Sequence, residues 1–449
     1  MFWSIYLLML ALFGALALFT QSAAAMGLLT IVVLVGLLLR VGLWRTMLVV
    51  SISTSVLRSS VFGGAMPESI WYALQFGPIV IAAVLGLFEA RPRLRPSDHL
   101  VIGFLFLFNS AAFLSSFFSK YSTESFAQAG ILILFTFFLS TAYTRRWRDM
   151  TTLNSDLRVL FVTLVVIQFV GLLGALFSDW AFDVDYGRYT GLFSNSNYAG
   201  LVSAMGVALG IYFLRGSRYQ IAVLVSIVIL VIGLIMSGSR GSLLAVIIGA
   251  LFALFSQINR STIFRLFLFI SVAGVVFVVL KPEALSDFFS SFVRTSGYDV
   301  SSGRLDIFRS VLEVFENSPI VGSGFRTTEL IQEGLTAHNL YLSVLAETGL
   351  LGAVMFFGLV LSVVAAGRRP GAPNPLLPAL VTVGAMELTE SSIFGFGGPT
   401  ATTAWLLVLA FSSYGRLVAE KLDKSNVLDS GAKTSLNRAE QTRCGATHG

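Results

Sequence analysis

The sequence predicts an all-α polytopic membrane protein with about 12 to 14 transmembrane helices. Of its 449 residues, 55% are hydrophobic and only 12% are charged, which excludes an ordinary soluble domain. Apolar runs of about 17 to 25 residues recur along the chain, the length that a helix needs to cross the hydrocarbon core. These runs are continuous and do not alternate in polarity, so a membrane β-barrel is excluded.

The predicted membrane segments form three blocks. Residues 1–69 hold N-terminal membrane helices, and the first run lacks the basic front of a cleavable signal peptide. A transmembrane core with polar motifs at its helix ends follows over 70–280, and C-terminal membrane helices cover 339–417. The predicted spans are 70–89, 99–118, 126–144, 157–178, 198–214, 219–236, 241–257, 263–280, 340–366, 376–394 and 400–416.

A large loop over residues 281–338 separates the last two blocks. Apolar residues within it recur at spacings of three and four, which predicts an amphipathic helix that Pro319 ends. The residues on its apolar face are Leu305, Phe308, Leu312 and Phe315. Residues 418–449 are rich in Ser, Thr, Asn, Lys and Gly, and we expect a disordered tail there.

The basic residues predict the orientation of the chain. Arginines and lysines gather in alternate linkers, at 91–95, 145–148, 215–218, 260–265, 368–369 and 416–424. By the positive-inside tendency this side is cytoplasmic, with both termini on it, and the 281–338 loop is extracytoplasmic. These linkers also account for the net charge of +6, so we expect no nucleic-acid partner.

Three predicted helices begin on the extracytoplasmic side, near Tyr198, Gly241 and Asn339. Helix N-termini carry unpaired N–H groups and a partial positive charge, so they favour anions such as phosphate. For each side chain alone the alternative is structural, because Asn and Ser cap helices and interfacial arginines reach lipid headgroups. The candidate residues at or near these starts are Arg188, Asn195, Asn197, Ser239, Arg240, Arg304, His338 and Asn339.

His338 is the candidate for proton transfer, because it lies where a polar loop enters a long apolar helix, unlike His99 and His448. The positive end of a helix disfavours protonated imidazole, and a neutral imidazole can accept a proton from a sugar hydroxyl. Buried carboxyl groups are usually functional or paired within membrane segments, and the apolar runs contain Glu347, Glu387 and Glu390. Asp183-Val-Asp185 has the spacing of a nucleotide-sugar metal motif, but acidic stretches are common in outer loops. There is no HExxH motif, no zinc-type cluster of His with carboxylates and only one cysteine, so we expect neither metal nor cofactor.

The order and spacing of these motifs resemble the O-antigen ligase family. They are Arg188-Tyr-Thr-Gly-Leu-Phe-Ser-Asn-Ser-Asn, Ser-Gly-Ser-Arg240-Gly-Ser-Leu-Leu-Ala, Gly303-Arg304, Asn317-Ser-Pro-Ile-Val-Gly-Ser-Gly-Phe325 and His338-Asn-Leu-Tyr-Leu-Ser-Val-Leu-Ala-Glu-Thr-Gly-Leu-Leu-Gly352. The resemblance implies a C-type glycosyltransferase-like fold in the bacterial inner membrane, with a donor glycan on undecaprenyl diphosphate. It assigns the essential histidine to His338 and the essential arginines to Arg240 and Arg304. Phe308 departs from the pattern, since relatives often have tryptophan there.

The predicted reaction is a metal-independent, inverting transfer to an acceptor hydroxyl on a glycan, lipid or protein, with His338 as general base. Arg188, Asn195, Asn197, Ser239 and Asn339 would bind substrate. One alternative is a polysaccharide polymerase that uses the same donor. Another, of a different class, is a transporter or flippase for a lipid-linked sugar, although transporters bind their cargo near the bilayer midplane.

Overall fold

A computed structural model describes residues 42–58, 67–89, 94–177, 179–183, 187–214, 219–255, 304–331, 337–368, 373–395 and 398–445. In these ranges it has thirteen α-helices, and the extended pairing is limited to one bridge between Phe182 and Tyr189. Eight of the described helices are long and apolar enough to cross a membrane. The predicted all-α polytopic fold is therefore confirmed, and the total number of crossings stays a prediction.

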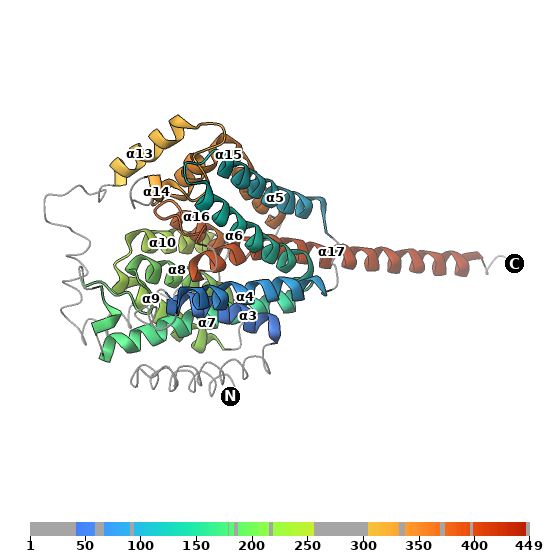
Figure 1. The fold of residues 1–449 in the computed structure, drawn as a ribbon. Coiled ribbons are helices and arrows are strands. Elements are labelled where there is room, and N and C mark those ends of the chain that lie inside the picture. The colour runs from blue at the N-terminus through green and yellow to red at the C-terminus, as the bar shows by residue number, and fades with distance from the viewer. Residues whose placement is uncertain are drawn as a thin grey trace.

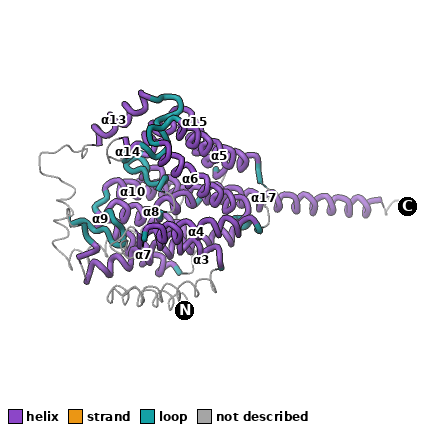
Figure 2. Tube along the Cα trace, viewed as in Figure 1, coloured by secondary structure: helices purple, strands orange, loops and turns teal. Residues whose placement is uncertain are grey.

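The helices form one bundle (Figures 1 and 2). Their bounds are α3 Leu43–Arg58, α4 Glu68–Leu87, α5 Pro96–Phe117, α6 Ser122–Thr141 with the π-helical turn η2 Ala142–Arg146, α7 Met150–Phe177, α8 Ser196–Leu214, α9 Gln220–Ser237, α10 Arg240–Phe255, α13 Arg304–Asn317, α14 Thr328–Ile331, α15 Leu340–Gly367, α16 Leu377–Met386 and α17 Pro399–Gly445. A 3₁₀ turn, η3 Asp179–Ala181, follows α7. The predicted span over 263–280 lies outside the described residues.

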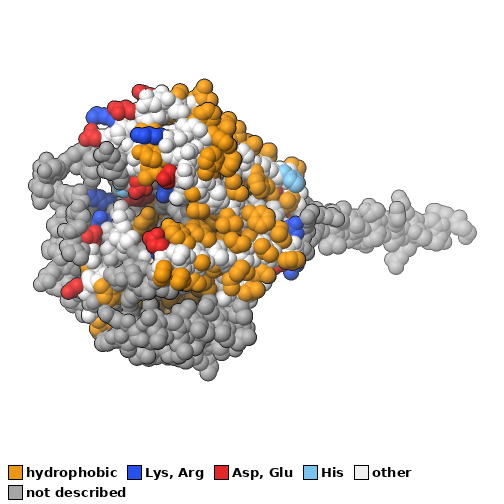
Figure 3. Space-filling view, in the orientation of Figure 1, with side chains coloured by type: hydrophobic (Ala, Val, Ile, Leu, Met, Phe, Trp, Pro, Cys, Tyr) orange, Lys and Arg blue, Asp and Glu red, His pale blue; other side chains and the backbone are white. Residues whose placement is uncertain are grey.

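Helix α8 is the central helix of the bundle. Within its most apolar stretch, 83% of the residues are buried, against 28% for α9. Glycines allow the close approach of α9, because a Cβ at Gly206 would overlap Leu230 and one at Gly210 would overlap Ile227. By contrast, hydrophobic side chains cover the outer face made by α4, α5 and α6 (Figure 3), as lipid contact requires. Helix α8 is thus a fixed support for the polar residues at its start.

Helix α15 is broken at Gly349, whose φ of 64° and ψ of −169° are not helical. The break leaves backbone groups without helical partners, and residues 319–324 provide partners for them. The bonds run from Ser323 N to Ala346 O (2.9 Å), Gly324 N to Glu347 O (3.1 Å), Leu350 N to Pro319 O (2.8 Å) and Leu351 N to Ile320 O (3.1 Å). The end of the 281–338 loop is thereby fixed to a membrane helix.

The predicted amphipathic helix is confirmed as α13, which ends at Asn317 shortly before Pro319. Its packed face differs from the predicted one: Ile307 and Val311 lie against Ala337 and Ala346, Phe315 joins this cluster, and Leu312 is 40% exposed. Figure 1 shows α13 lying across the end of the bundle next to α15. This places the loop's helix near the start of α15.

Two regions differ from the expectations. The predicted span over 376–394 ends as a helix at Met386, because the Glu387 carboxylate accepts hydrogen bonds from Ser392 N (3.0 Å) and Ile393 N (3.3 Å) and turns the chain back. The tail predicted to be disordered over 418–449 is helical as far as Gly445, as the end of α17. This segment contains no proline and many residues that favour helix, including Ala, Leu, Lys, Glu and Arg. The proposed domain boundaries stay predictions.

The end of the bundle from which α17 projects holds a buried ionic network, called here the basic-end network. Its members are Arg45, Arg146, Trp147 and Asp156. The Asp156 side chain is 2% exposed and accepts hydrogen bonds from Arg45 Nε at 2.5 Å and Arg146 Nε at 2.9 Å. The Trp147 indole N–H adds a third donor at 3.2 Å. These residues join α3, η2 and α7.

Candidate functional site

The site is built around the loop over residues 387–395, which follows α16. The chain that enters α15 is bound to this loop, since Leu340 N donates to Glu387 O (2.9 Å) and Asn339 Nδ2 donates to Leu388 O (3.0 Å). The start of α10 also lies against it, because a Cβ added at Gly241 would overlap the Thr389 side chain. The loop therefore brings the starts of α10 and α15 together.

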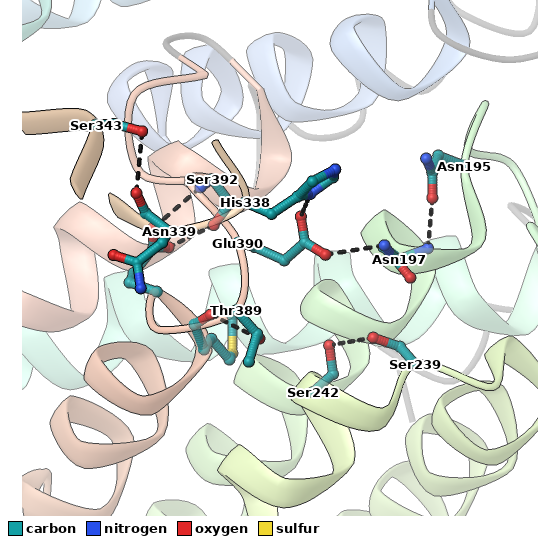
Figure 4. A network of polar contacts seen from close by, with 12 residues as sticks. Asn195, Asn197, Ser239, Ser242, His338, Asn339, Ser343, Thr389, Glu390 and Ser392 are labelled. Atoms are coloured by element: carbon teal, nitrogen blue, oxygen red, sulfur yellow. Dashed lines mark hydrogen bonds and ion pairs between the residues drawn. The ribbon is translucent and has the colours of Figure 1, made fainter. Parts of the chain in front are cut away.

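Glu390, at the centre of this loop, pairs with the candidate base His338. The distance from His338 Nδ1 to Glu390 Oε2 is 3.1 Å, and the side chains are 33% and 14% exposed. The pair is drawn in Figure 4, where the two side chains point toward each other from different loops. His338 has a positive φ of 46°, an uncommon conformation for a residue other than glycine. Nδ1 is thus the ring nitrogen that meets the carboxylate, and Nε2 is on the other side of the ring.

Asn197 connects this pair to the first motif. Its Nδ2 donates to Glu390 Oε1 at 2.9 Å, so Glu390 lies between Asn197 and His338 (Figure 4). Its Oδ1 accepts from Arg188 Nη2 at 3.1 Å, and Arg188 Nε donates to Ser237 O at 2.9 Å. Residues from four separate segments thus form one chain, from Arg188 through Asn197 and Glu390 to His338.

Three other candidates have local contacts. Asn339 is the N-cap of α15, where its Oδ1 accepts from Leu342 N at 3.0 Å. Asn195 Oδ1 accepts from Asn197 N at 2.7 Å at the start of α8. Both contacts are of the capping type. Ser239 instead donates from Oγ to Ser242 Oγ at 2.9 Å, a contact between two side chains. These contacts order the helix starts beside the His338–Glu390 pair.

The two arginines assigned by resemblance occupy the starts of helices. Arg240 is the first residue of α10, and Gly241 beside it contacts Thr389, the neighbour of Glu390. Arg304 is the first residue of α13, but its side chain lies outside the described residues. The structure therefore brings His338, Asn197 and Arg188 into one chain of contacts and places the start of α10 next to it.

Sequence reasoning pointed to Glu390 only as an ionisable group in an apolar segment. Its partner could not be read from the sequence, because His338 lies 52 residues away, on the far side of α15 and α16. Glu387 has a different role from Glu390, since its carboxylate is satisfied within its own loop by Ser392 Oγ at 2.5 Å. One carboxylate shapes the loop and the other faces the histidine.

A family model described as O-Antigen ligase matches residues 225–357. The matched region holds the start of α10, α13, the break in α15 and His338, and it stops before Glu390. A search of curated proteins found no match. The match supports the resemblance predicted from the motifs, and over residues 225–357 the chain is similar to the O-antigen ligase family.

Proposed function

We propose that this protein is an O-antigen ligase-type membrane glycosyltransferase that moves a glycan from an undecaprenyl diphosphate carrier to an acceptor hydroxyl. The observation that carries the proposal is the His338–Glu390 pair, 3.1 Å apart, beside the starts of α8, α10 and α15. This arrangement joins a proton acceptor to helix ends suited to a diphosphate. A ligase and a polymerase would share this chemistry and differ in the acceptor: a lipid, a protein or another lipid-linked glycan.

In the proposed reaction, His338 Nε2 takes the proton of the acceptor hydroxyl while that oxygen attacks the anomeric carbon of the donor sugar. The bond from the anomeric carbon to the diphosphate oxygen breaks, and the lipid diphosphate leaves with the electron pair. A single displacement of this kind inverts the anomeric configuration. Glu390 holds the imidazole with Nδ1 toward its carboxylate and stabilises the imidazolium that forms.

The leaving diphosphate gains negative charge, and cations with fixed geometry would stabilise it. In this proposal Arg240 and Arg304 bind the diphosphate, helped by Arg188 and by the N-termini of α8 and α10. The contacts of Arg188 with Ser237 O and Asn197 support this role, because they fix one edge of the guanidinium. Asn195, Asn197, Ser239 and Asn339 would order these elements around the substrate.

The orientation supports an active site on the extracytoplasmic face of the bacterial inner membrane. The basic-end network and the neighbouring Arg416 lie at the other end of the bundle, which the positive-inside tendency assigns to the cytoplasm. Cysteines introduced at Tyr198 and at Arg148 test this orientation. A membrane-impermeant thiol reagent added to intact spheroplasts should label the first and spare the second, and the reverse pattern would contradict it.

The decisive experiment is glycan transfer by purified protein in detergent, with a defined undecaprenyl diphosphate glycan, candidate acceptors and mass spectrometry of the products. His338→Ala should lower transfer by at least about 10²-fold, since general bases contribute 10²–10⁴-fold. His99→Ala is the matched control, because this histidine is exposed at the start of α5, and it should leave the rate unchanged. A transporter would produce no transferred glycan without a membrane, and that result would overturn the proposal.

A further inference from the structure

Arg326 is a cation that the sequence analysis did not single out, and the fold holds its backbone firmly. It lies between Phe325 and Thr327, both fully buried, in the segment joining α13 to α14. Phe325 packs against Phe108 of α5 at 6.3 Å between ring centroids. The Arg326 N–H donates to the buried Glu347 carboxylate at 2.9 Å. The backbone of Arg326 therefore has a fixed position.

The backbone of Arg326 is in the left-handed region, with a φ of 60°. For a residue other than glycine this conformation is strained, and glycine would adopt it without strain. Because such strain clusters at functional sites, an arginine here calls for an explanation in terms of its side chain.

The segment that carries Arg326 lies against the loop of the proposed active site, because Phe325 packs on Phe394 of the 387–395 loop with 5.3 Å between the ring centroids. Together with the Glu390 carboxylate, the Arg326 guanidinium contributes to the electrostatic environment of the Tyr198 hydroxyl in the first turn of α8. Tyr198 follows Asn197, the residue that binds Glu390. The charge of Arg326 therefore acts on the helix start that holds Asn197, and Arg326 comes from a different loop.

The simple structural alternative is that Arg326 neutralises Glu347. Arg326 does attract the Glu347 carboxylate electrostatically. However, within the described ranges no carboxylate lies at ion-pair distance from its guanidinium, and the guanidinium makes no hydrogen bond. Glu347 is bound by the Arg326 backbone N–H, a contact that any residue except proline would make. Arg326 is partly exposed, so its guanidinium donors are available to a ligand.

We propose that Arg326 is a further substrate-binding residue of this site and binds the diphosphate of the lipid-linked donor. This inference rests on the proposed glycosyltransferase function. Planar guanidinium groups match phosphate oxygens in bidentate geometry. A guanidinium fixed by a strained, buried segment would be already ordered when the donor arrives.

Binding of a short-chain polyprenyl diphosphate to the purified full-length protein, measured by titration calorimetry in detergent, tests the proposal. Arg326→Gly removes the guanidinium and also relieves the left-handed backbone, so the variant should fold. It should raise the Kd at least tenfold, and Arg326→Lys should give an intermediate value, because lysine binds phosphate as a point charge. Arg309→Ala is the control: this arginine is 77% exposed on α13 and should bind the probe as the wild type does.

Equal Kd values for Arg326→Gly and Arg309→Ala, with tight binding by the wild type, would overturn the role of Arg326 and leave the proposed function standing. In the transfer assay, a rise in the KM for the acceptor alone in Arg326→Gly would also overturn this role. The Arg326 guanidinium would then bind a group on the acceptor and not the diphosphate of the donor. Absence of probe binding by the wild type, together with absence of glycan transfer, would overturn both proposals.

Discussion

The two ends of the bundle handle charge in different ways. At one end, Asp156 is 2% exposed and two arginines and an indole N–H saturate its carboxylate. At the other end, the carboxylate of Glu390 is 14% exposed and bonds to His338 and Asn197, while His338 is 33% exposed. The first arrangement is closed to solvent and the second is open to it. Buried charge thus joins helices at one end, and partly exposed charge can meet a substrate at the other.

The largest expected effect is on stability, at the basic end. Asp156→Ala removes the buried carboxylate shared by Arg45 and Arg146, although Arg146 keeps its ion pair with Glu89 at 2.9 Å. Breaking a buried ion pair destabilises a protein by about 3–5 kcal/mol, and we expect an effect toward the lower end because both arginines are partly exposed. Thermal unfolding of the purified protein in detergent should show a markedly lower Tm. Asp306→Ala, at a carboxylate that is 78% exposed, is the control and should leave the Tm nearly unchanged. Equal Tm values for the two variants would show that the network does not hold the helices together.

Glu390→Ala should show the opposite pattern at the other end. Loss of the carboxylate frees the imidazole from its fixed orientation, and we expect the transfer rate to fall by about 10²-fold. The Tm should change little, because Glu390 is partly exposed. Glu313→Ala, on the exposed face of α13, is the matched control for both measurements. A much lower Tm with an unchanged transfer rate would show that Glu390 stabilises the fold, as Asp156 does, and does not act in transfer.

A smaller effect tests how the site is assembled. Gly241→Ala would force a Cβ into the Thr389 side chain and push α10 away from the 387–395 loop. Overpacking of this kind destabilises by about 1–3 kcal/mol, and transfer should fall with it. At Gly103 a Cβ meets no atom within 4 Å, so Gly103→Ala should stabilise α5 slightly. Unfolding midpoints and transfer rates for both variants measure the difference.

The smallest effect is expected at the N-cap of α15. Asn339→Ala removes the acceptor for Leu342 N and should destabilise by about 1 kcal/mol. Asn339→Asp keeps this acceptor but loses the bond to Leu388 O, so it separates helix capping from attachment to the loop. If only the aspartate variant preserves stability while both lower transfer, the contact with Leu388 positions the site.

The helices could be predicted closely because each is a long apolar run, and the predicted starts of α8, α10 and α15 lie within a few residues of the observed ones. Hydropathy could not show that α16 ends at Met386, since that depends on how the Glu387 side chain bonds to its own loop. Likewise, the pairing of His338 with Glu390 depends on packing across two helices. Arg326 was missed because its neighbours read as an ordinary glycine-rich turn, and only the folded backbone shows its strain.

The break in α15 has a consequence for protein engineering. Residues 319–324 and the turn around Gly349 complete each other's backbone bonds, so neither is a self-sufficient module. A chimera that imports only the loop of a relative would place a foreign 319–324 segment against the native turn around Gly349, and their backbone hydrogen bonds would not be matched. Exchange of acceptor preference between relatives should therefore move the segment from Arg304 through Gly367 as one cassette.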